Sequence, residues 1–456
     1  MARVKSKWIC QQCGYETAGY LGKCPECGSW GSFTEEVQSN LKPQNVSPQG
    51  IANDTKPSLI NDIHIGEEVR ISTNISEFDR ILGGGLVQGS LVLIAGDPGI
   101  GKSTILLQTS GELCKNGQKI LYVSAEESAS QLKLRANRLG IKAENLYIYP
   151  QTNLESIRAQ IDELQPDMVV IDSIQAIYSQ TISSSAGSVS QIRECCNILM
   201  QIAKNRGITT IVIGHVTKDG NIAGPKILEH MVDTVISFEG DKYKSYRMLR
   251  SMKNRFGNTS EVGIFEMQTQ GLVEVKNPNE LFLNERSQDA IPGSAIIVTN
   301  EGTRPLLVEI QALVGTTPYP TPRRVTNGVD NSRLLQILAV LEKRVGLNLS
   351  KQDVYVNVMG GIEIDEPSAD LGIAIAIATC ARDVVVDPQT VIIGEIGLSG
   401  EIHPVSNIEK RLNEAVTSGF KKAIIPYANR NIINDKIKIV PVKRLIDAIT
   451  ACISPN

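Results

Sequence analysis

Residues 96–103, GDPGIGKS, have the types and spacing of a loop that binds phosphate. They fit G-x-x-x-x-G-K-[ST] at every position, and the glycines let the backbone wrap so that its N–H groups point at a phosphate chain. Lys102 can reach the β and γ phosphates of a nucleotide, and the Ser103 hydroxyl can bind Mg²⁺. The pattern predicts a protein that binds ATP with Mg²⁺. The predicted nucleotide contacts are Gly96, Asp97, Pro98, Gly99, Ile100, Gly101, Lys102, Ser103 and Thr104.

Polar side chains end three later strands predicted in the same region. The first strand leads to Glu126 and Glu127, either of which can orient and deprotonate an attacking water. The alternative for these two is a solvated charge pair that begins a helix. Asp172 ends the second strand, where a carboxylate holds Mg²⁺ or its water. His215 ends the third, as a sensor of the γ-phosphate or as a structural histidine. With Lys102, the three acids are the predicted catalytic residues.

Four cysteines near the N-terminus form two C-x-x-C pairs, each followed by a glycine. This spacing predicts a tetrahedral Zn²⁺ held by four thiolates, which leaves no open position for catalysis. A segment of about 30 residues buries too little surface to fold alone, so metal binding supplies its folding energy. Disulfides or a redox pair are the alternatives, but two matched pairs without a βαβ context favour zinc. The predicted ligands are Cys10, Cys13, Cys24 and Cys27.

The composition is that of an ordinary soluble globular protein, with 41% hydrophobic and 21% charged residues over 456 positions. A net charge of −3 excludes a uniformly basic nucleic-acid coat, so any such binding must use local patches. No apolar run approaches a membrane span, and the N-terminus lacks the apolar core of a signal peptide. We therefore expect a cytoplasmic protein without a membrane partner.

The order of apolar runs predicts the elements that position these residues. Short strands alternate with helical stretches, as a parallel sheet with crossover helices requires, and the fold class is therefore α/β. The predicted strands around the loop are 91–95, 119–124, 167–173 and 209–214. The predicted domains are a zinc-binding segment 1–35, a flexible linker 36–64, a phosphate-loop domain 65–275 and an α+β domain 276–456.

The segment 242–256, KYKSYRMLRSMKNRF, carries six cations, no acid and three aromatic residues. Cations that follow phosphates and rings that stack on bases are typical of a groove for single-stranded DNA. The alternatives are a β-hairpin with a solvated face, or a cation that reaches the γ-phosphate bound by a neighbouring subunit. If the segment binds phosphates, Lys253→Ala is expected to lower the salt dependence of DNA affinity by about one.

Residues 253–257, KNRFG, together with the four cysteines and the phosphate loop, closely resemble the bacterial RadA (Sms) recombination and repair family. The resemblance covers nearly the whole chain. It implies a RecA-like, DNA-dependent and helicase-like ATPase, forming a hexameric ring that binds single-stranded DNA and drives branch migration. It also implies catalytic roles for Lys253 and Arg255 near the subunit interface or the DNA. A RecA-type recombinase is the implied protein partner.

The last domain is similar to the proteolytic domain of Lon. Residues 366–369, EPSA, resemble the segment around the Lon serine, and 394–405 its strand-and-turn signature. Glu409 stands where Lon has its lysine base, so we expect Ser368 to be a helix N-cap residue rather than a nucleophile. The resemblance then implies an assembly scaffold with added DNA surface. Two alternatives for the whole protein are an ATP-dependent serine peptidase and a nucleotide-switched adaptor that recruits a recombinase.

Overall fold

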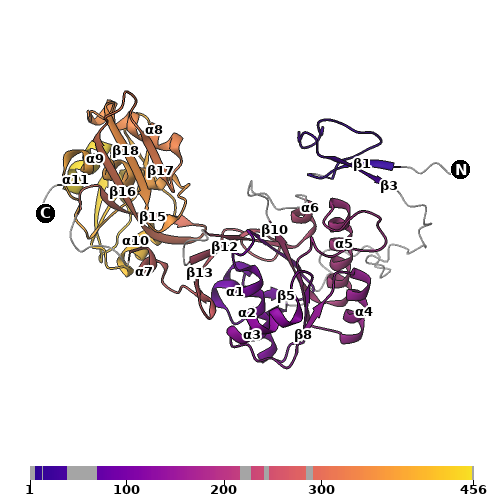
Figure 1. Ribbon diagram of the computed structural model, residues 1–456. Helices are drawn as coiled ribbons and strands as arrows, with labels where there is room; N and C mark the ends of the chain where they lie inside the picture. Colours follow the sequence, from indigo (N-terminus) through magenta and orange to yellow (C-terminus); the bar gives the residue numbers. More distant parts are fainter. Residues whose placement is uncertain are drawn as a thin grey trace, which may run out of the picture. The chain divides into compact units, whose positions relative to one another are not determined.

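The structure is a computed structural model that describes residues 6–12, 14–37, 69–215, 227–240, 246–283 and 291–453. The chain divides into two compact units, residues 1–275 and 276–456 (Figure 1). Predictions for Cys13, for the linker over 38–64 and for Lys242 and Lys244 lie outside the described residues. In the described part of the chain, no helix has the length and apolar character needed to cross a membrane.

The N-terminal residues form a small antiparallel sheet of three strands in the order β2-β1-β3. Cys10 ends one strand, and Cys24 and Cys27 lie in the loop that leads to the last strand. Cys10, Cys24 and Phe33 are buried together against Trp8, so the core of this sheet is built around thiols. The strands are β1 Ser6–Cys10, β2 Glu16–Thr17 and β3 Phe33–Val37.

The phosphate-loop region is built on a nine-stranded sheet in the order β14-β13-β12-β11-β6-β10-β9-β7-β8. The six strands from β11 to β8 are parallel, and β12, β13 and β14 extend the sheet as an antiparallel edge. The four predicted strands are the adjacent strands β6, β10, β9 and β7, which confirms the predicted α/β class. The strands are β6 Leu91–Gly96, β7 Ile120–Ser124, β8 Leu146–Pro150, β9 Met168–Asp172, β10 Thr209–His215, β11 Thr234–Glu239, β12 Tyr246–Asn254, β13 Val262–Gln268 and β14 Gly271–Glu274.

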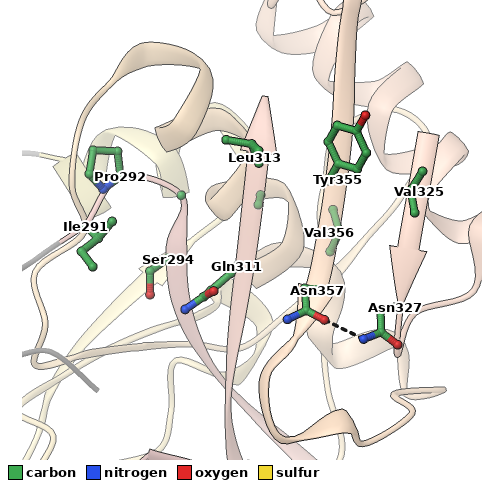
Figure 2. Close-up of a pocket in the computed structure, with 12 residues that line it drawn as sticks. Ile291, Pro292, Ser294, Gln311, Leu313, Val325, Asn327, Tyr355, Val356 and Asn357 are labelled. Carbon is green, nitrogen blue, oxygen red and sulfur yellow. Dashed lines mark hydrogen bonds between the residues drawn. The ribbon is translucent and has the colours of Figure 1, made fainter. Parts of the chain in front are cut away.

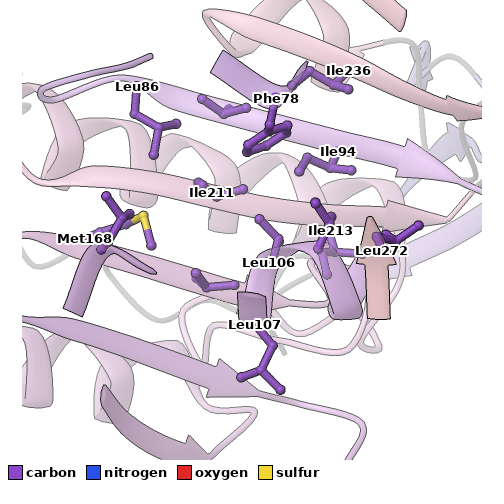
Figure 3. Packing of buried hydrophobic residues seen from close by; sticks show 14 of the residues in the cluster. Phe78, Leu86, Ile94, Leu106, Leu107, Met168, Ile211, Ile213, Ile236 and Leu272 are labelled. Carbon is purple, nitrogen blue, oxygen red and sulfur yellow. The ribbon is translucent and has the colours of Figure 1, made fainter. Parts of the chain in front are cut away.

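Helices cover both faces of this sheet because successive strand residues alternate between two buried clusters. One cluster joins Ile94 of β6 and Ile213 of β10 to helices α1, α2 and α3 (Figure 3). The other joins Leu93 and Val212 of the same strands to helices α4, α5 and α6. The helices are α1 Ser76–Leu82, α2 Lys102–Lys115, α3 Ala129–Arg138, α4 Leu154–Leu164, α5 Val189–Arg206 and α6 Ile227–Met231, and a short hairpin joins β4 Arg70–Ile71 to β5 Leu86–Val87.

The C-terminal unit contains a mixed seven-stranded sheet in the order β17-β18-β16-β15-β19-β22-β23. Helix α9 packs on one face, where Gly372 allows a close approach to Ile297, and α10 packs on the other face through Leu412. The strands of this sheet are β15 Ser294–Glu301, β16 Arg304–Thr316, β17 Arg324–Asn327, β18 Gln352–Val358, β19 Thr390–Ile392, β22 Lys422–Pro426 and β23 Lys438–Val442. A separate two-stranded sheet is formed by β20 Glu395–Ile396 and β21 Ile402–His403. The helices are α7 Pro278–Leu283, α8 Asn331–Val340, α9 Asp370–Arg382, α10 Ile408–Thr417 and α11 Leu445–Ile453.

A groove of about 500 Å³ hollows the sheet of this unit over β15, β16, β17 and β18 (Figure 2). Leu313 and Val325 line it with apolar side chains that remain exposed, and Tyr355 lies between them. Asn327 and Asn357 are joined by a 2.8 Å hydrogen bond at its lower end in this view. The groove lies far along the chain from the phosphate loop and takes no part in the site described next.

Candidate active site

The phosphate loop connects β6 to α2, and the side chain of Lys102 is hydrogen-bonded to backbone carbonyls of this loop. The Nζ atom of Lys102 donates to the carbonyl oxygens of Gly96 at 2.7 Å and Asp97 at 2.8 Å. The side chain is buried, and burial lowers the pKa of Lys102 to about 8. Gly101 has a φ of 123°, which favours glycine, and a side chain there would lie 2.9 Å from the Met267 methyl carbon. Gly101 and the contacts of Lys102 thus hold the loop in a tight turn of the kind that binds phosphate.

Asp172, at the end of β9, lies against the first turn of α2. Its carboxylate lies close to the Ser103 hydroxyl, and the buried Tyr122 hydroxyl donates to its Oδ2 atom at 2.8 Å. Burial raises the pKa of Asp172, while the Ser103 and Tyr122 hydroxyls favour its ionised form. A hydroxyl beside a carboxylate is the oxygen pair that Mg²⁺ takes at a phosphate loop. Ser103 and Asp172 therefore fit a magnesium ion.

The two glutamates that the sequence left equivalent have different surroundings. Oε1 of Glu126 accepts hydrogen bonds from the Ser173 hydroxyl at 2.5 Å and from Nε2 of His215 at 3.1 Å. Glu126 therefore belongs to the cluster at the ends of β7, β9 and β10. Glu127 instead forms a 2.7 Å ion pair with Arg135 of α3. We infer that Glu126 is the acid that faces the nucleotide.

The charge of Glu126 is stabilised by the groups around it. Burial alone would raise the pKa of this carboxyl, but the hydrogen bonds from Ser173 and His215 and the nearby Lys102 charge hold it below its ordinary value. The side chain remains 46% exposed, so water can reach it. An ionised, accessible carboxylate beside the phosphate loop has the state that a proton acceptor requires.

The KNRFG segment lies beside the starts of the parallel strands, whereas the phosphate loop follows the carboxyl end of β6. Thr234 pairs with Val92 near the start of β6 and also with Asn254 at the end of β12. The loop begins at Gly96, the other end of β6, which places it about 13 Å further along the strand. Within one subunit, Lys253 and Arg255 are therefore not brought together with the other predicted catalytic residues.

Both cations of this segment have partners inside the protein. Nζ of Lys253 donates to the carbonyl oxygens of Glu229, His230 and Val232 at 2.7, 3.2 and 2.8 Å, and so caps the end of α6. Arg255 contacts the buried Asp233 carboxylate at 3.2 Å and remains 54% exposed. These contacts leave Arg255 more available to an external phosphate than Lys253.

Three residues that contact the site were not among the predicted site residues. Tyr122 and Ser173 hold the two acids, and Arg247 of β12 donates from Nε to the Ile100 carbonyl at 3.1 Å. Arg247 was expected on a DNA-binding surface because it is one of six cations in a run. Its buried position shows that the charge of this residue does not by itself indicate whether its side chain points to solvent or into the protein. The order of strands, which brings β12 to the loop, was the missing information.

The cysteine cluster fits a metal ion. The sulfur atoms of Cys10, Cys24 and Cys27 lie within 4.8 Å of one another, and Cys13 lies outside the described residues. Cys10 and Cys24 are buried at the centre of the small sheet. Three converging thiols, with a fourth cysteine three residues after the first, supply the donor set that a structural Zn²⁺ prefers. Bound there, zinc would link the two cysteine loops to the sheet.

Ser368 is not the N-cap residue that we predicted. It lies in a 3₁₀ turn, Pro367–Ala369, and α9 begins only at Asp370 with Ala369 as its cap. The chain needs this extra turn because Glu366 is tied to β15, where it accepts from the Asn300 N–H at 2.7 Å. The buried guanidinium of Arg411 donates to Ser368 Oγ at 3.2 Å and pairs with Glu366. Because a guanidinium cannot act as a base, Arg411 cannot activate Ser368 as a nucleophile.

Comparisons with known families match three parts of the chain. Residues 67–221 match the AAA domain, residues 8–35 the rubredoxin metal binding domain, and residues 326–429 subunit ChlI of Mg-chelatase. Among solved structures, a KaiC-like protein from Pyrococcus horikoshii OT3 aligns over 45% of this chain and 99% of its own, with 24% identity and a TM-score of 0.39. A match at that level adds nothing to the assignment of the family.

Curated relatives extend over almost the full length. The DNA repair protein RadA of Bacillus subtilis (strain 168) is 52% identical and covers 94% of each chain. That of Halalkalibacterium halodurans is 50% identical over 98% of this chain and 99% of its own, and that of Synechocystis sp. 48% identical over 100% and 96%. The resemblance stated from the cysteines, the loop and the KNRFG segment is thereby confirmed. This chain belongs to the RadA family of DNA repair proteins.

Proposed function

We propose that this chain is a DNA-dependent ATPase of homologous recombination and DNA repair. The observation that carries the proposal is the cluster at the carboxyl edge of the parallel strands. Lys102 and Ser103 begin α2 directly after the loop that follows β6, Glu126 follows the end of β7, and Asp172 ends β9. In an open α/β sheet, ligands bind at this edge. A phosphate-binding lysine, a magnesium pair and an ionised carboxylate are the groups that ATP hydrolysis requires.

Each residue of this cluster has a separate role in ATP hydrolysis. Loop N–H groups and Lys102 bind the β and γ phosphates and offset their charge. Ser103 and Asp172 would hold Mg²⁺, and the ion would supply positive charge beside the phosphate oxygens. Glu126 orients a water in line with the γ-phosphorus and accepts its proton as the new P–O bond forms and the bond to the bridging oxygen breaks. Ser173 and His215 keep the Glu126 carboxylate aimed at the site.

The DNA part of the proposal rests on family membership and on Arg255. The relatives are named as DNA repair proteins, and Arg255 is a half-exposed cation at the edge away from its own phosphate loop. A cation there serves single-stranded DNA or the nucleotide of a neighbouring subunit in a ring. We extend the proposal to a hexameric ring that drives branch migration of recombination intermediates, with a RecA-type recombinase as protein partner.

The test is the rate of ATP hydrolysis by the purified protein with and without single-stranded DNA. We expect DNA to raise the rate severalfold, and Lys102→Ala to reduce both rates by at least tenfold, since it removes a charged contact to the phosphates. Hydrolysis that survives Lys102→Ala would refute the site. A wild-type rate of ATP hydrolysis that single-stranded DNA does not change would instead favour the nucleotide-switched adaptor.

The peptidase alternative finds no support at Ser368. This side chain is buried, and its neighbours are the Arg411 guanidinium and the Glu366 carboxylate. Burial would raise the pKa of Glu366, but Arg411 and the Asn300 N–H hold it below its ordinary value, which makes the carboxylate a weak base. The charged pair instead ties α10 to β15, as a scaffold role requires.

A further inference from the structure

Arg247 lies on β12 and reaches the phosphate loop from outside the nucleotide site. Its side chain is 6% exposed. Nε donates to the Ile100 carbonyl at 3.1 Å, and Nη1 donates to the Tyr246 carbonyl at 2.8 Å. In a phosphate loop the N–H groups face the ligand, so a cation on a loop carbonyl holds the opposite side of the backbone. The contact joins the middle of the loop to the sheet.

The strand that carries Arg247 is held on both edges. β12 pairs with β11 on one side and with β13 on the other, and Arg247 itself is paired with Phe265. Gly240 leaves the space that the arginine occupies, because a side chain there would lie 2.9 Å from the Cδ atom of Arg247. A cation on a fixed strand, in a space kept open by a glycine, gives the loop a rigid anchor.

We propose that Arg247 is a positioning residue that holds the Ile100 peptide, and through it the N–H groups of the loop, in the orientation that binds nucleotide phosphates. The proposal rests on the proposed ATPase function and adds a residue to its binding step. Without this anchor, nucleotide binding must also order the loop, which weakens affinity. Glu126 follows β7 and Asp172 ends β9, and both strands lie on the other side of β6 from β12, so the chemical step is affected less than binding.

The experiment compares Arg247→Gln with Arg250→Gln by calorimetric titration with ADP and by steady-state ATP hydrolysis. Arg250 is the matched control, since it lies on the same strand but pairs with Glu239. A hydrogen bond from a charged donor predicts that Arg247→Gln weakens ADP binding and raises KM for ATP about tenfold or more, with kcat within about threefold of wild type. Arg250→Gln should stay within about twofold for all three.

A second variant covers the case in which Arg247→Gln does not fold. Gly240→Ala keeps the arginine but places a methyl group against its Cδ atom at an exposed position, and we expect KM for ATP to rise at least threefold. Wild-type ADP affinity in folded Arg247→Gln, or an unchanged KM in Gly240→Ala, would overturn the proposal. Wild-type protein that binds ADP but does not hydrolyse ATP would refute the proposed function and leave the binding role of Arg247 standing.

Discussion

Replacing Glu126 by glutamine tests the assignment of the proton acceptor. Glutamine keeps the length of the side chain and can still accept from Ser173, but it cannot take a proton from water. Removing a positioned general base costs about 10²–10⁴-fold in rate, which is about 3–5 kcal/mol of activation free energy. We therefore expect kcat for ATP hydrolysis to fall by at least 100-fold. ATP binding should change by only a few fold, because no phosphate contact is removed.

Glu127→Gln is the matched control for this variant. Glu127 is paired with Arg135, and the two side chains are 30% and 24% exposed, so the pair contributes about 0–1 kcal/mol to stability. We expect kcat within about twofold of wild type. The assay is phosphate release at saturating ATP, with nucleotide affinity measured separately by calorimetry. Glu126→Gln that keeps more than a tenth of wild-type kcat, or a larger loss in Glu127→Gln, would refute the assignment of the base.

Three further predictions concern parts of the molecule away from the base. Removing zinc with a chelator, or replacing Cys24 by serine, should unfold the N-terminal sheet and abolish its chemical-shift dispersion without changing the ATPase rate. Arg255→Ala should reduce the steepness of log DNA affinity against log salt by about one. For Lys253→Ala, the contacts with α6 replace the same expectation made from the sequence, and the variant should chiefly lower the melting temperature because it removes the cap of that helix. The pKa of Glu366 is lowered on folding, so its contribution to stability is full above pH 4.5 and is lost as pH falls below it. Glu366→Gln should cost roughly 3 kcal/mol at pH 7, since Arg411 stays buried, and should weaken the acid dependence measured by urea unfolding.

Each of these has an outcome that contradicts it. An N-terminal sheet that stays folded in chelator would mean that zinc is not its source of stability. Equal salt slopes in wild type and Arg255→Ala would remove that residue from the DNA contacts. An acid dependence that survives in full in Glu366→Gln would place the titrating group elsewhere.

Much of the fold and the gathering of site residues followed from the sequence. Apolar runs marked four of the strands, and the rule that parallel strands share a carboxyl edge placed Asp172 and Glu126 near Lys102. Helix α2 followed from the loop pattern. These inferences depend on local periodicity and on one topological rule, which a single sequence contains.

Partners distant in sequence could not be predicted. Glu126 is bound by Ser173, whereas Glu127 is bound by Arg135. No local sequence pattern indicates which glutamate has which partner. The N-cap prediction for Ser368 failed because the tie between Glu366 and β15 adds a 3₁₀ turn before α9. Arg247 resembled a DNA-binding cation until the strand order placed it on the loop. In each case a long-range contact decided the outcome.

The contacts of Lys102 have a consequence for selectivity. Its ammonium group donates to two carbonyls of its own loop, so an anion that binds the lysine competes with these two hydrogen bonds. Inorganic phosphate can make few contacts to offset their loss, whereas a nucleoside triphosphate can make many along the loop. We therefore expect the loop to bind inorganic phosphate weakly and the enzyme to be little inhibited by this product.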